Sequence, residues 1–478
     1  MSETTCIRNA DWVVAWDSAE ARHGFLRGAD VAFRAEDIVH VGPAYEGTVD
    51  REIDGRDLVV MPGLVNVHSH PMSEPMNKGV TDEMGSRRLG MSGLYEYMPA
   101  FRPDAEGIAA CAELAYAELL KSGVTTLVDL SVPWDGWLEL MARSGLRGVL
   151  APMYRSARWY TQNGYSVEYE WDEKAGRQAF DAALSLIDRA RQHPSGRLGG
   201  MLTPSQIDTC TEELLRDSAA AAEERNLPLQ IHASQSVVEF NEMTRRHGKT
   251  PIEWLDEIGF LGPSATIAHC IFVDHHSWVR WPDRRDLDLL VETGTSVAHC
   301  PTVFVRRGIL LQNFGAYMKA GVNVGLGTDT FPHNFLEEIR TAATLSRVAA
   351  EDVAVLGTGD ALHAATIGGA NILKRDDIGR LSPGAKADIV LIEARHPAMQ
   401  PLRDPIRSLV YAAAERAVRD VYVGGAQVVA DGEVLGLDHA GAALQVTEAQ
   451  RRAEGRVPEA DYAGRRHDEL VPLSLPML

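Results

Sequence analysis

Two histidines of this chain stand where a metal site could form. His68 and His70 are separated by one residue at the end of an apolar run, in the sequence PGLVNVHSH. Because residues i and i+2 of a β-strand point to the same side, both imidazole rings could reach one metal ion. The pair alone indicates little, since the chain has 16 histidines and these two could equally be hydrogen-bonded or exposed to solvent.

Two more histidines and an aspartate also follow short apolar runs. His232 ends the run LQIH, His269 ends the run TIAH, and Asp329 follows the residues GLGT. If these runs are strands of one parallel barrel, their carboxyl ends converge on one mouth, where the chemistry of such barrels takes place. We therefore expect the four histidines and Asp329 to gather at that mouth.

The elements that would position these residues alternate regularly along the middle of the chain. The expected strands are Val59–Val67, Thr125–Leu130, Gly148–Tyr154, Leu198–Thr203, Pro228–His232, Thr266–Cys270, Ser296–Cys300 and Asn323–Gly327. Amphipathic helices are expected at Ala105–Lys121, Gln178–Gln192, Glu212–Arg225 and Asp286–Glu292. Such alternation is typical of repeated βα units, and eight strands is the number that closes a (β/α)8 barrel.

The two ends of the chain have a different pattern, with short alternating runs separated by turn residues. Such runs occur at Asp11–Trp16, Asp30–Phe33, Ile38–Val41 and Val418–Val423. We predict an α/β protein in which residues 61–380 form a TIM-like barrel, while residues 1–60 and 381–478 together form a small β-sandwich domain. The segment from Glu448 onward is charged and then rich in Pro and Leu, and we expect it to form an arm over a neighbouring subunit of a homo-oligomer.

Composition excludes several classes of protein. The 478 residues include 67 Asp and Glu against 47 Lys and Arg, so the formal net charge is −20. This acidity argues against nucleic-acid binding, which needs clustered basic residues, and mildly disfavours anionic substrates and anionic membrane surfaces. We find no signal peptide, no apolar stretch long enough to span a bilayer, and no CxxC spacing among the five cysteines. We therefore expect a cytoplasmic protein that acts on a small molecule.

Together, PGLVNVHSH, the fifth-strand His232, His269-Cys270, GLGTD and GAKADIV resemble the motifs of the amidohydrolase superfamily. The resemblance runs in order from about residue 55 to about residue 395. It is closest to the mononuclear branch, which includes cytosine, guanine and S-adenosylhomocysteine deaminases and the triazine chlorohydrolases. It implies a barrel with a composite terminal β-domain, in agreement with the pattern described above.

The resemblance also implies a cofactor and a ligand set. One divalent metal ion, with Zn(II) as the first choice and Fe(II) or Mn(II) as alternatives, would be held by His68, His70, His232 and Asp329. The metal would lower the pKa of bound water toward about 7, which gives a hydroxide at neutral pH. Asp329 would accept the proton of this water, and His269 would orient the water or polarise the substrate.

Residue 235 departs from the pattern of these deaminases, which normally place a glutamate three residues after the fifth-strand histidine. That position is Gln235 here, and an amide cannot act as a general acid or base. Gln235 could instead orient a substrate carbonyl while Asp329 transfers protons. This favours cleavage of a non-peptide C–N bond in an amide, urea or carbamate of a small neutral molecule, and the local pattern also resembles that of phenylurea and thiocarbamate hydrolases.

Other interpretations stay open at this point. A different acid could replace the missing glutamate, and the candidates are Glu74, Asp82, Glu83, Glu96 and His333. The enzyme could be an aminoheterocycle deaminase or a chlorohydrolase. The chain could also be a catalytically silent metal-binding relative, with a natural or engineered Glu→Gln change.

Besides Gln235, four residues are expected to contact the substrate: His299, Phe304, Tyr95 and His333. His299 ends the seventh strand, Phe304 follows it in a more apolar segment than nucleoside deaminases carry, and Tyr95 lies in a Met- and Tyr-rich segment after the first strand. Such residues would accept aromatic or alkyl groups, although core packing would explain them equally well.

Overall fold

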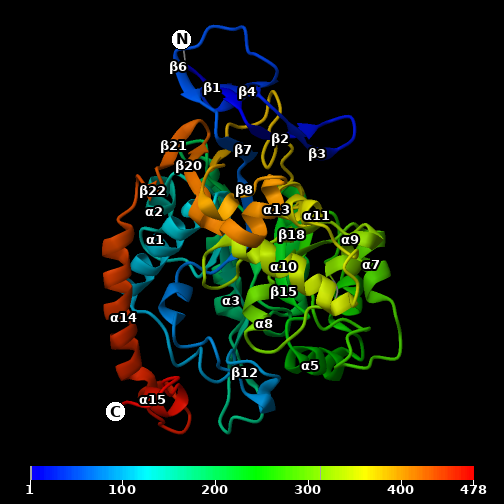
Figure 1. Ribbon diagram of the computed structural model, residues 1–478. Helices are drawn as coiled ribbons and strands as arrows, with labels where there is room; N and C mark the ends of the chain where they lie inside the picture. The colour runs from blue at the N-terminus through cyan, green and yellow to red at the C-terminus, as the bar shows by residue number, and fades with distance from the viewer. Residues whose placement is uncertain (1–2, 313) are drawn as a thin grey trace.

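The computed structural model describes residues 3–312 and 314–478, which form a barrel with two additional sheets at one end (Figure 1). The barrel strands are β8 (Leu64–Ser69), β9 (Val124–Ser131), β10 (Arg147–Tyr154), β13 (Gly199–Gly200), β14 (Thr203–Pro204), β15 (Leu229–Ala233), β16 (Ala265–His269), β17 (Ser296–His299) and β18 (Val324–Leu326). They form two parallel sheets, each of which makes half of the barrel wall. One contains β8, β9, β10, β13 and β14, and the other contains β15, β16, β17 and β18. Bridges between Ser69 and Asp329 and between Leu202 and Leu229 join the halves. The predicted TIM-like barrel is confirmed.

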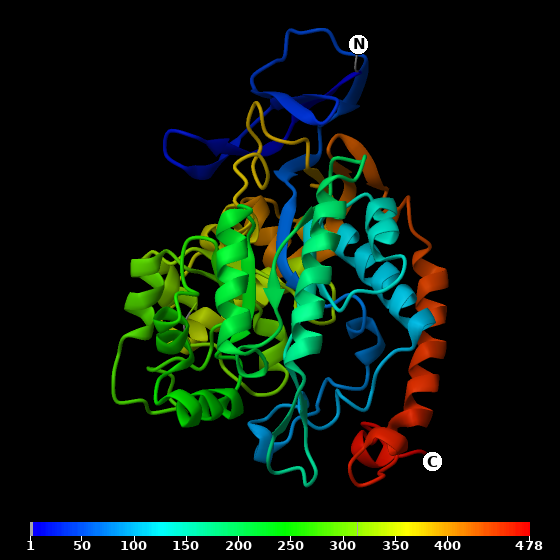
Figure 2. The ribbon, with the colours of Figure 1, turned by 180° about the vertical axis from the view of Figure 1, so that it is seen from behind.

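Helices cover the outside of this wall (Figures 1 and 2). They are α1 (Ala105–Lys121), α2 (Trp137–Ser144), α3 (Glu173–Arg191), α4 (Glu212–Glu224), α5 (Val237–His247), α6 (Pro251–Glu257), α7 (Asp286–Thr293), α8 (Pro301–Val305), α9 (Phe314–Ala320), α10 (Phe335–Ala350), α11 (Thr358–His363) and α12 (Gly369–Ile372). Side-chain caps fix several helix starts, since Asp104 accepts a hydrogen bond from the Gly107 N–H and Thr211 accepts one from the Leu214 N–H. A hairpin of β11 (Ala157–Tyr160) and β12 (Glu168–Trp171) follows β10.

The prediction that Val59–Val67 forms a single first strand is wrong. The structure divides it at Gly63 into β7 (Leu58–Pro62), which belongs to a terminal sheet, and β8, which begins the barrel. Gly63 packs so closely on Thr125 that a Cβ atom would lie 2.0 Å from Thr125 Oγ1. The dipeptide Pro62-Gly63 is a turn signal within this run, and the prediction of one strand passed over it because both halves are equally apolar.

The predicted fourth strand, Leu198–Thr203, is also divided. Its residues form two short strands, β13 and β14, which pair with β10 at different points along its length. Gly200 packs against Ile187 of α3, and a Cβ atom there would lie 2.5 Å from that side chain.

The terminal sheets form the predicted composite β-domain. One sheet consists of the N-terminal strands β1 (Thr4–Ala10), β4 (Ala29–Arg34), β5 (Asp37–Gly42) and β6 (Arg51–Asp54). The other joins β2 (Trp12–Asp17), β3 (Arg22–Leu26) and β7 to β19 (Ile389–Glu393), β20 (Val418–Val423), β21 (Ala426–Ala430) and β22 (Glu433–Val434). Apolar side chains from both sheets, such as Ile7, Val60 and Leu391, share one buried core.

The GAKADIV segment attaches this β-domain to the barrel. Asp388 accepts hydrogen bonds from Nε and Nη2 of Arg147, both at 3.0 Å, and from the Gly424 N–H at 2.7 Å. Both charged side chains are almost fully buried, and the two hydrogen bonds from Arg147 to Asp388 add to the attraction between their charges. Because Arg147 starts β10, the β-domain lies beside the amino-terminal ends of the barrel strands, and the carboxyl ends face away from it.

The segment from Glu448 onward does not have the form of the predicted arm. The segment belongs to a long helix, α14 (His439–Ala460), which runs along the side of the barrel against α1 of the same chain (Figures 1 and 2). The contact is close, since a Cβ atom on Gly107 would lie 2.7 Å from Cβ of Ala449. A short helix, α15 (His467–Leu470), follows. In the described part of the chain, no helix has the length and hydrophobicity that a bilayer span requires.

Candidate metal centre

The predicted ligand residues meet at the carboxyl end of the barrel. His68 ends β8, His70 follows it, His232 lies near the end of β15, and Asp329 comes shortly after β18. Nε2 of His70 lies 3.2 Å from Nε2 of His232 and 3.3 Å from Oδ1 of Asp329. Nε2 of His68 lies 3.4 Å from the same carboxylate oxygen. Three ring nitrogens and one carboxylate therefore point at a common space.

The outer nitrogens of these rings show which tautomer each ring adopts. Nδ1 of His70 faces the Leu130 carbonyl at 2.7 Å, and Nδ1 of His232 faces the Ser205 carbonyl at 2.5 Å. Nδ1 of His68 faces the side-chain oxygen of Gln230. Because each partner is an acceptor, each Nδ1 carries the proton and each Nε2 presents a lone pair.

Two Nε2 lone pairs at 3.2 Å cannot form a hydrogen bond with each other. A divalent cation would satisfy them, and the Nδ1–H···O bonds are the usual outer support of metal-bound histidines. The residues present therefore fit a metal ion of borderline softness such as zinc.

Burial keeps this site in the protonation state that a cation needs. Burial lowers the pKa of His70 to about 4 and places the pKa of His232 well below its usual value. For Asp329, burial alone would raise the pKa, but the neighbouring His68 and His269 hold it well below the usual range. His70 and His232 are therefore neutral and Asp329 is ionised near neutral pH, which are the protonation states that bind a cation.

The backbone is unusual at the ends of these strands. Ser234, His269 and Asp329 have φ values of 56°, 72° and 58°, a region that non-glycine residues rarely adopt. Asp329 is clamped by two backbone hydrogen bonds, one from its N–H to the His68 carbonyl at 2.8 Å and one from the His70 N–H to its own carbonyl at 2.9 Å. Such strained positions cluster at functional sites, and here they turn side chains into the mouth.

The fourth histidine, His269, lies beside the ligand set. Its ring centroid is 4.9 Å from that of His68 and 5.3 Å from that of His232. On another side, its ring meets Phe304 edge-on at 4.9 Å. This position is suited to contact with a molecule bound at the metal rather than to a fourth imidazole ligand.

A cavity of about 460 Å³ opens over the ligand set. Of the five residues predicted to contact substrate, Gln235 and Phe304 line it, together with His70, His232, His269 and Asp329. Tyr95, His299 and His333 are buried outside its wall. Tyr95 pairs with Ser236 Oγ at 2.6 Å, His299 stacks on Phe314, and His333 lies beside Glu118. Of these three, Tyr95 supports the mouth directly, because its partner Ser236 lines the cavity.

The structure separates the acids that could replace a glutamate at position 235. Within the described chain, Glu74 and Asp329 are the acidic residues that line the cavity. Asp82 forms an ion pair with Arg306, and Glu96 forms one with Arg465. Burial and the charge of Asp329 raise the pKa of Glu74 to about 7.

Four arginines also line the cavity, a feature that the sequence analysis missed: Arg102, Arg155, Arg158 and Arg307. Arg158 pairs with Glu170, but in the described part of the chain the other three have no carboxylate within ion-pair distance. Burial, together with neighbouring arginines, lowers the pKa of Arg102 and of Arg155. No sequence pattern indicates this group, because its members come from three separate segments: the one before α1, the one that runs from the end of β10 into β11, and the one after α8.

Gln230 is a second residue that was missed. Its side chain accepts the hydrogen bond from His68 Nδ1 and donates another to the Val67 carbonyl at 3.0 Å. A signal was present, since Gln230 lies two residues before His232 in the same strand and therefore points into the barrel with it.

Comparison with known proteins agrees with this geometry. The model of the Amidohydrolase family matches residues 59–428. A 5'-deoxyadenosine deaminase of Methanopyrus kandleri is 31% identical over 80% of this chain and 84% of its own length. A 5-methylthioadenosine/S-adenosylhomocysteine deaminase of Pelotomaculum thermopropionicum is 30% identical over 91% of this chain and 95% of its own length.

Solved structures show the same fold. An adenosine deaminase from Xanthomonas campestris with bound zinc has a TM-score of 0.79 and 24% identity, and covers 94% of this chain and 98% of its own. Atrazine chlorohydrolase from Arthrobacter aurescens, in complex with zinc, has a TM-score of 0.76 and 22% identity, and covers 93% and 100%. Because the family model matches most of its length and relatives of 30–31% identity cover 80–91% of it, this chain belongs to the amidohydrolase family of hydrolases that act on non-peptide C–N bonds.

Proposed function

We propose that this chain is a metal-dependent deaminase of an aminopurine nucleoside or a related aminoheterocycle. The proposed ligands are His68, His70, His232 and Asp329, with Zn(II) as the metal. The observation that carries the proposal is the set of three Nε2 lone pairs and one carboxylate at the wall of the cavity. The deaminases that share 30–31% of its sequence support this substrate class over the amides and ureas that the sequence alone favoured.

The residues around the site would have separate roles in the reaction. A divalent cation bound there would supply Lewis acidity and activate water for attack on a ring carbon. Asp329 accepts a proton from the attacking water, and His269 hydrogen-bonds to the atoms that react. One C–O bond forms and one C–N bond breaks, and the amine departs as ammonia after it has gained a proton.

Glu74 is our candidate for the acid that delivers this proton. It lines the same cavity as Asp329, and burial places its pKa close to neutrality, where a group can both give and take protons. Gln235 would then bind the substrate without exchanging protons. The buried carboxylate of Glu239 holds the Gln235 backbone in place, since it accepts hydrogen bonds from the N–H groups of Ser234 and Gln235 at 2.5 and 3.3 Å.

The cavity arginines indicate that the substrate carries negative charge. Arg155 and Arg307 have no carboxylate partner in the described chain, and guanidinium groups at the wall of a cavity bind carboxylate or phosphate strongly. We therefore propose a substrate with an anionic group away from the reacting ring. This replaces the neutral molecule expected from composition, because a net charge of −20 says nothing about where the cations gather.

A second candidate function is hydrolysis of an amide, urea or carbamate. The observation in its favour is Gln235, whose amide can orient a carbonyl but cannot protonate a ring nitrogen.

A substrate panel with metal analysis tests both functions. Ammonia release would be measured from adenosine-type nucleosides with and without a carboxylate-bearing 5' substituent, and amine release from ureas, amides and carbamates. We expect zinc in the protein and fastest turnover of the carboxylate-bearing nucleoside. Turnover of ureas alone would establish the second candidate. Bound zinc without any turnover, unchanged by Gln235→Glu, would mean a catalytically silent relative.

A further inference from the structure

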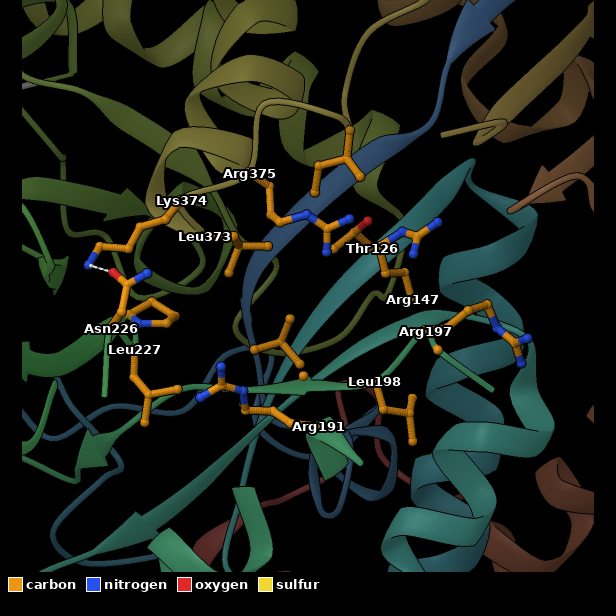
Figure 3. Close-up of a pocket in the computed structure, with 16 residues that line it drawn as sticks. Thr126, Arg147, Arg191, Arg197, Leu198, Asn226, Leu227, Leu373, Lys374 and Arg375 are labelled. Carbon is orange, nitrogen blue, oxygen red and sulfur yellow. Dashed lines mark hydrogen bonds between the residues drawn. The ribbon is translucent and has the colours of Figure 1, made fainter. Parts of the chain in front are cut away.

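A second cavity lies at the amino-terminal ends of the barrel strands, opposite the metal centre, and we call it the base pocket because it lies at the base of the barrel. Figure 3 shows the residues that line it. It has a volume of about 320 Å³, and its walls come from the first residues of β9, β10 and β13, from the segment before β15 and from residues 373–375 after α12. In the described chain it shares no lining residue with the catalytic cavity. Packed apolar side chains, among them Val67, Val128 and Met201, fill the barrel interior.

The base pocket concentrates positive charge in an acidic protein. Five basic side chains line it, namely Arg147, Arg191, Arg197, Lys374 and Arg375, and no acidic side chain of the described residues does. The buried pair with Asp388 neutralises Arg147, and two hydrogen bonds to Asp377 neutralise Arg375.

The other three cations have no carboxylate within ion-pair distance in the described chain. Lys374 donates a hydrogen bond to the side-chain oxygen of Asn226 at 2.9 Å, and Arg191 has only a backbone carbonyl in reach, at 3.5 Å. Arg197 donates one hydrogen bond to the Ala142 carbonyl, while its Nε is buried with no acceptor among the described atoms. Figure 3 shows Lys374 joined to Asn226 at one side of the pocket.

Cations gathered around a concave surface repel one another, and an anion with several oxygen atoms relieves that repulsion while it accepts their hydrogen bonds. Burial and the nearby Arg147 lower the pKa of Arg197 against the smaller opposing effects of Asp388 and Glu36, which agrees with a net positive potential in the pocket.

We propose that the base pocket binds the phosphate group of a small phosphate monoester. Arg191 and Lys374, which are exposed at its opening, contact the phosphate, and Arg197 adds its charge from the wall. The pocket is larger than a phosphate ion needs, and Leu227, Leu373 and Ile378 offer an apolar surface for the organic part of the ligand. The bound ligand stabilises the folded chain, because the site exists only in the folded state.

Calorimetric titration of the metal-loaded protein tests the proposal, with glycerol phosphate and inorganic phosphate as probes and chloride at matched ionic strength. The test variant is Arg191→Gln/Lys374→Gln. The matched control is Arg189→Gln, which removes an exposed arginine from the same helix, outside the base pocket. Neither variant changes a residue that lines the cavity at the metal centre, so metal content and the midpoint of thermal unfolding, compared with the wild type, report that the fold is intact.

We expect saturable binding of glycerol phosphate to the wild-type protein and to Arg189→Gln, with the dissociation constant raised at least about tenfold in the double variant. Equal affinity for inorganic phosphate would identify the free ion as the ligand and leave the phosphate chemistry supported. Binding that is unchanged in the double variant, or a response to chloride as strong as to phosphate, would overturn the proposal. Because the readout is binding, failure of the proposed deaminase activity would leave this test unaffected.

Discussion

At the scale of single residues, Gln230 decides how His68 presents its lone pair. Replacing it by leucine removes the acceptor for His68 Nδ1–H while it keeps a side chain of similar size. We predict that Gln230→Leu weakens metal affinity by about 10- to 100-fold, as is typical when the outer support of a metal-bound histidine is lost. Metal titration with a competing chelator measures this change. Gln192→Leu, at an exposed glutamine outside the site, is the control, and equal affinities in the two variants would refute the role of Gln230.

A second prediction at this scale concerns the acid of the reaction. If Glu74 delivers the proton, Glu74→Gln lowers kcat by about 100- to 10,000-fold with little change in KM, because the lost interaction acts in the transition state. Glu96→Gln, whose carboxylate pairs with Arg465 outside the cavity, keeps its kcat. Steady-state kinetics on the best nucleoside of the panel gives both values.

The double variant Glu74→Gln/Gln235→Glu sharpens this test. In this variant only residue 235, and no longer residue 74, has a carboxyl group that can exchange a proton. This is the position at which the resemblance to deaminases implies a glutamate. We expect partial recovery of kcat, whereas an undiminished kcat in Glu74→Gln itself would rule out Glu74 as the acid.

At the scale of elements, Gly63 decides where the β-domain ends and the barrel begins. A methyl group there would lie 2.0 Å from Thr125 Oγ1, which forces β8 away from β9. We predict that Gly63→Ala lowers the free energy of unfolding by about 1–3 kcal/mol, the usual cost of overpacking. Chemical denaturation measures it against Gly24→Ala, a strand glycine with no atom within 4 Å of a built Cβ. A loss of the same size in both variants would contradict the role of the Gly63 contact.

At the scale of the whole molecule, buried histidines make stability depend on pH. Burial lowers the pKa of His299 to about 3, from an ordinary value of 6.5, and burial also lowers those of His23 and His333 to about 3. Between these values the unfolded chain binds more protons than the folded one. The stabilising contribution of each such histidine therefore falls as the pH drops below about 6.5, by up to about 1.4 kcal/mol per pH unit, and levels off near pH 3. Buried carboxyls with raised pKa values, such as Glu74, act in the opposite direction.

Denaturation of the metal-free protein between about pH 7 and pH 5 measures this slope. The His299→Asn variant lacks this titrating group. We therefore expect its free energy of unfolding to fall less steeply with decreasing pH than that of the wild type, whatever the change in absolute stability. A slope that stays the same would show that His299 titrates alike in the folded and unfolded chain.

The amino-acid sequence by itself determined the class of fold and which histidines, together with Asp329, meet at the mouth. Apolar runs and amphipathic segments follow from chain-local periodicity, and each of His68, His232 and His269 stands at the end of such a run, so local pattern was enough to place them at one end of a barrel. Within Val59–Val67 the Pro62-Gly63 pair signals a break, but local pattern could not show that the two halves join different sheets, because both halves are equally apolar.

What only the tertiary structure decided is which distant side chains share a space. Glu74 lines the cavity, while Asp82 and Glu96 form ion pairs elsewhere. Tyr95 and His299 are buried outside the cavity wall, and arginines from separate segments of the chain line both cavities. These outcomes depend on packing between elements that are far apart in the chain. Local sequence patterns do not predict the distances between such elements.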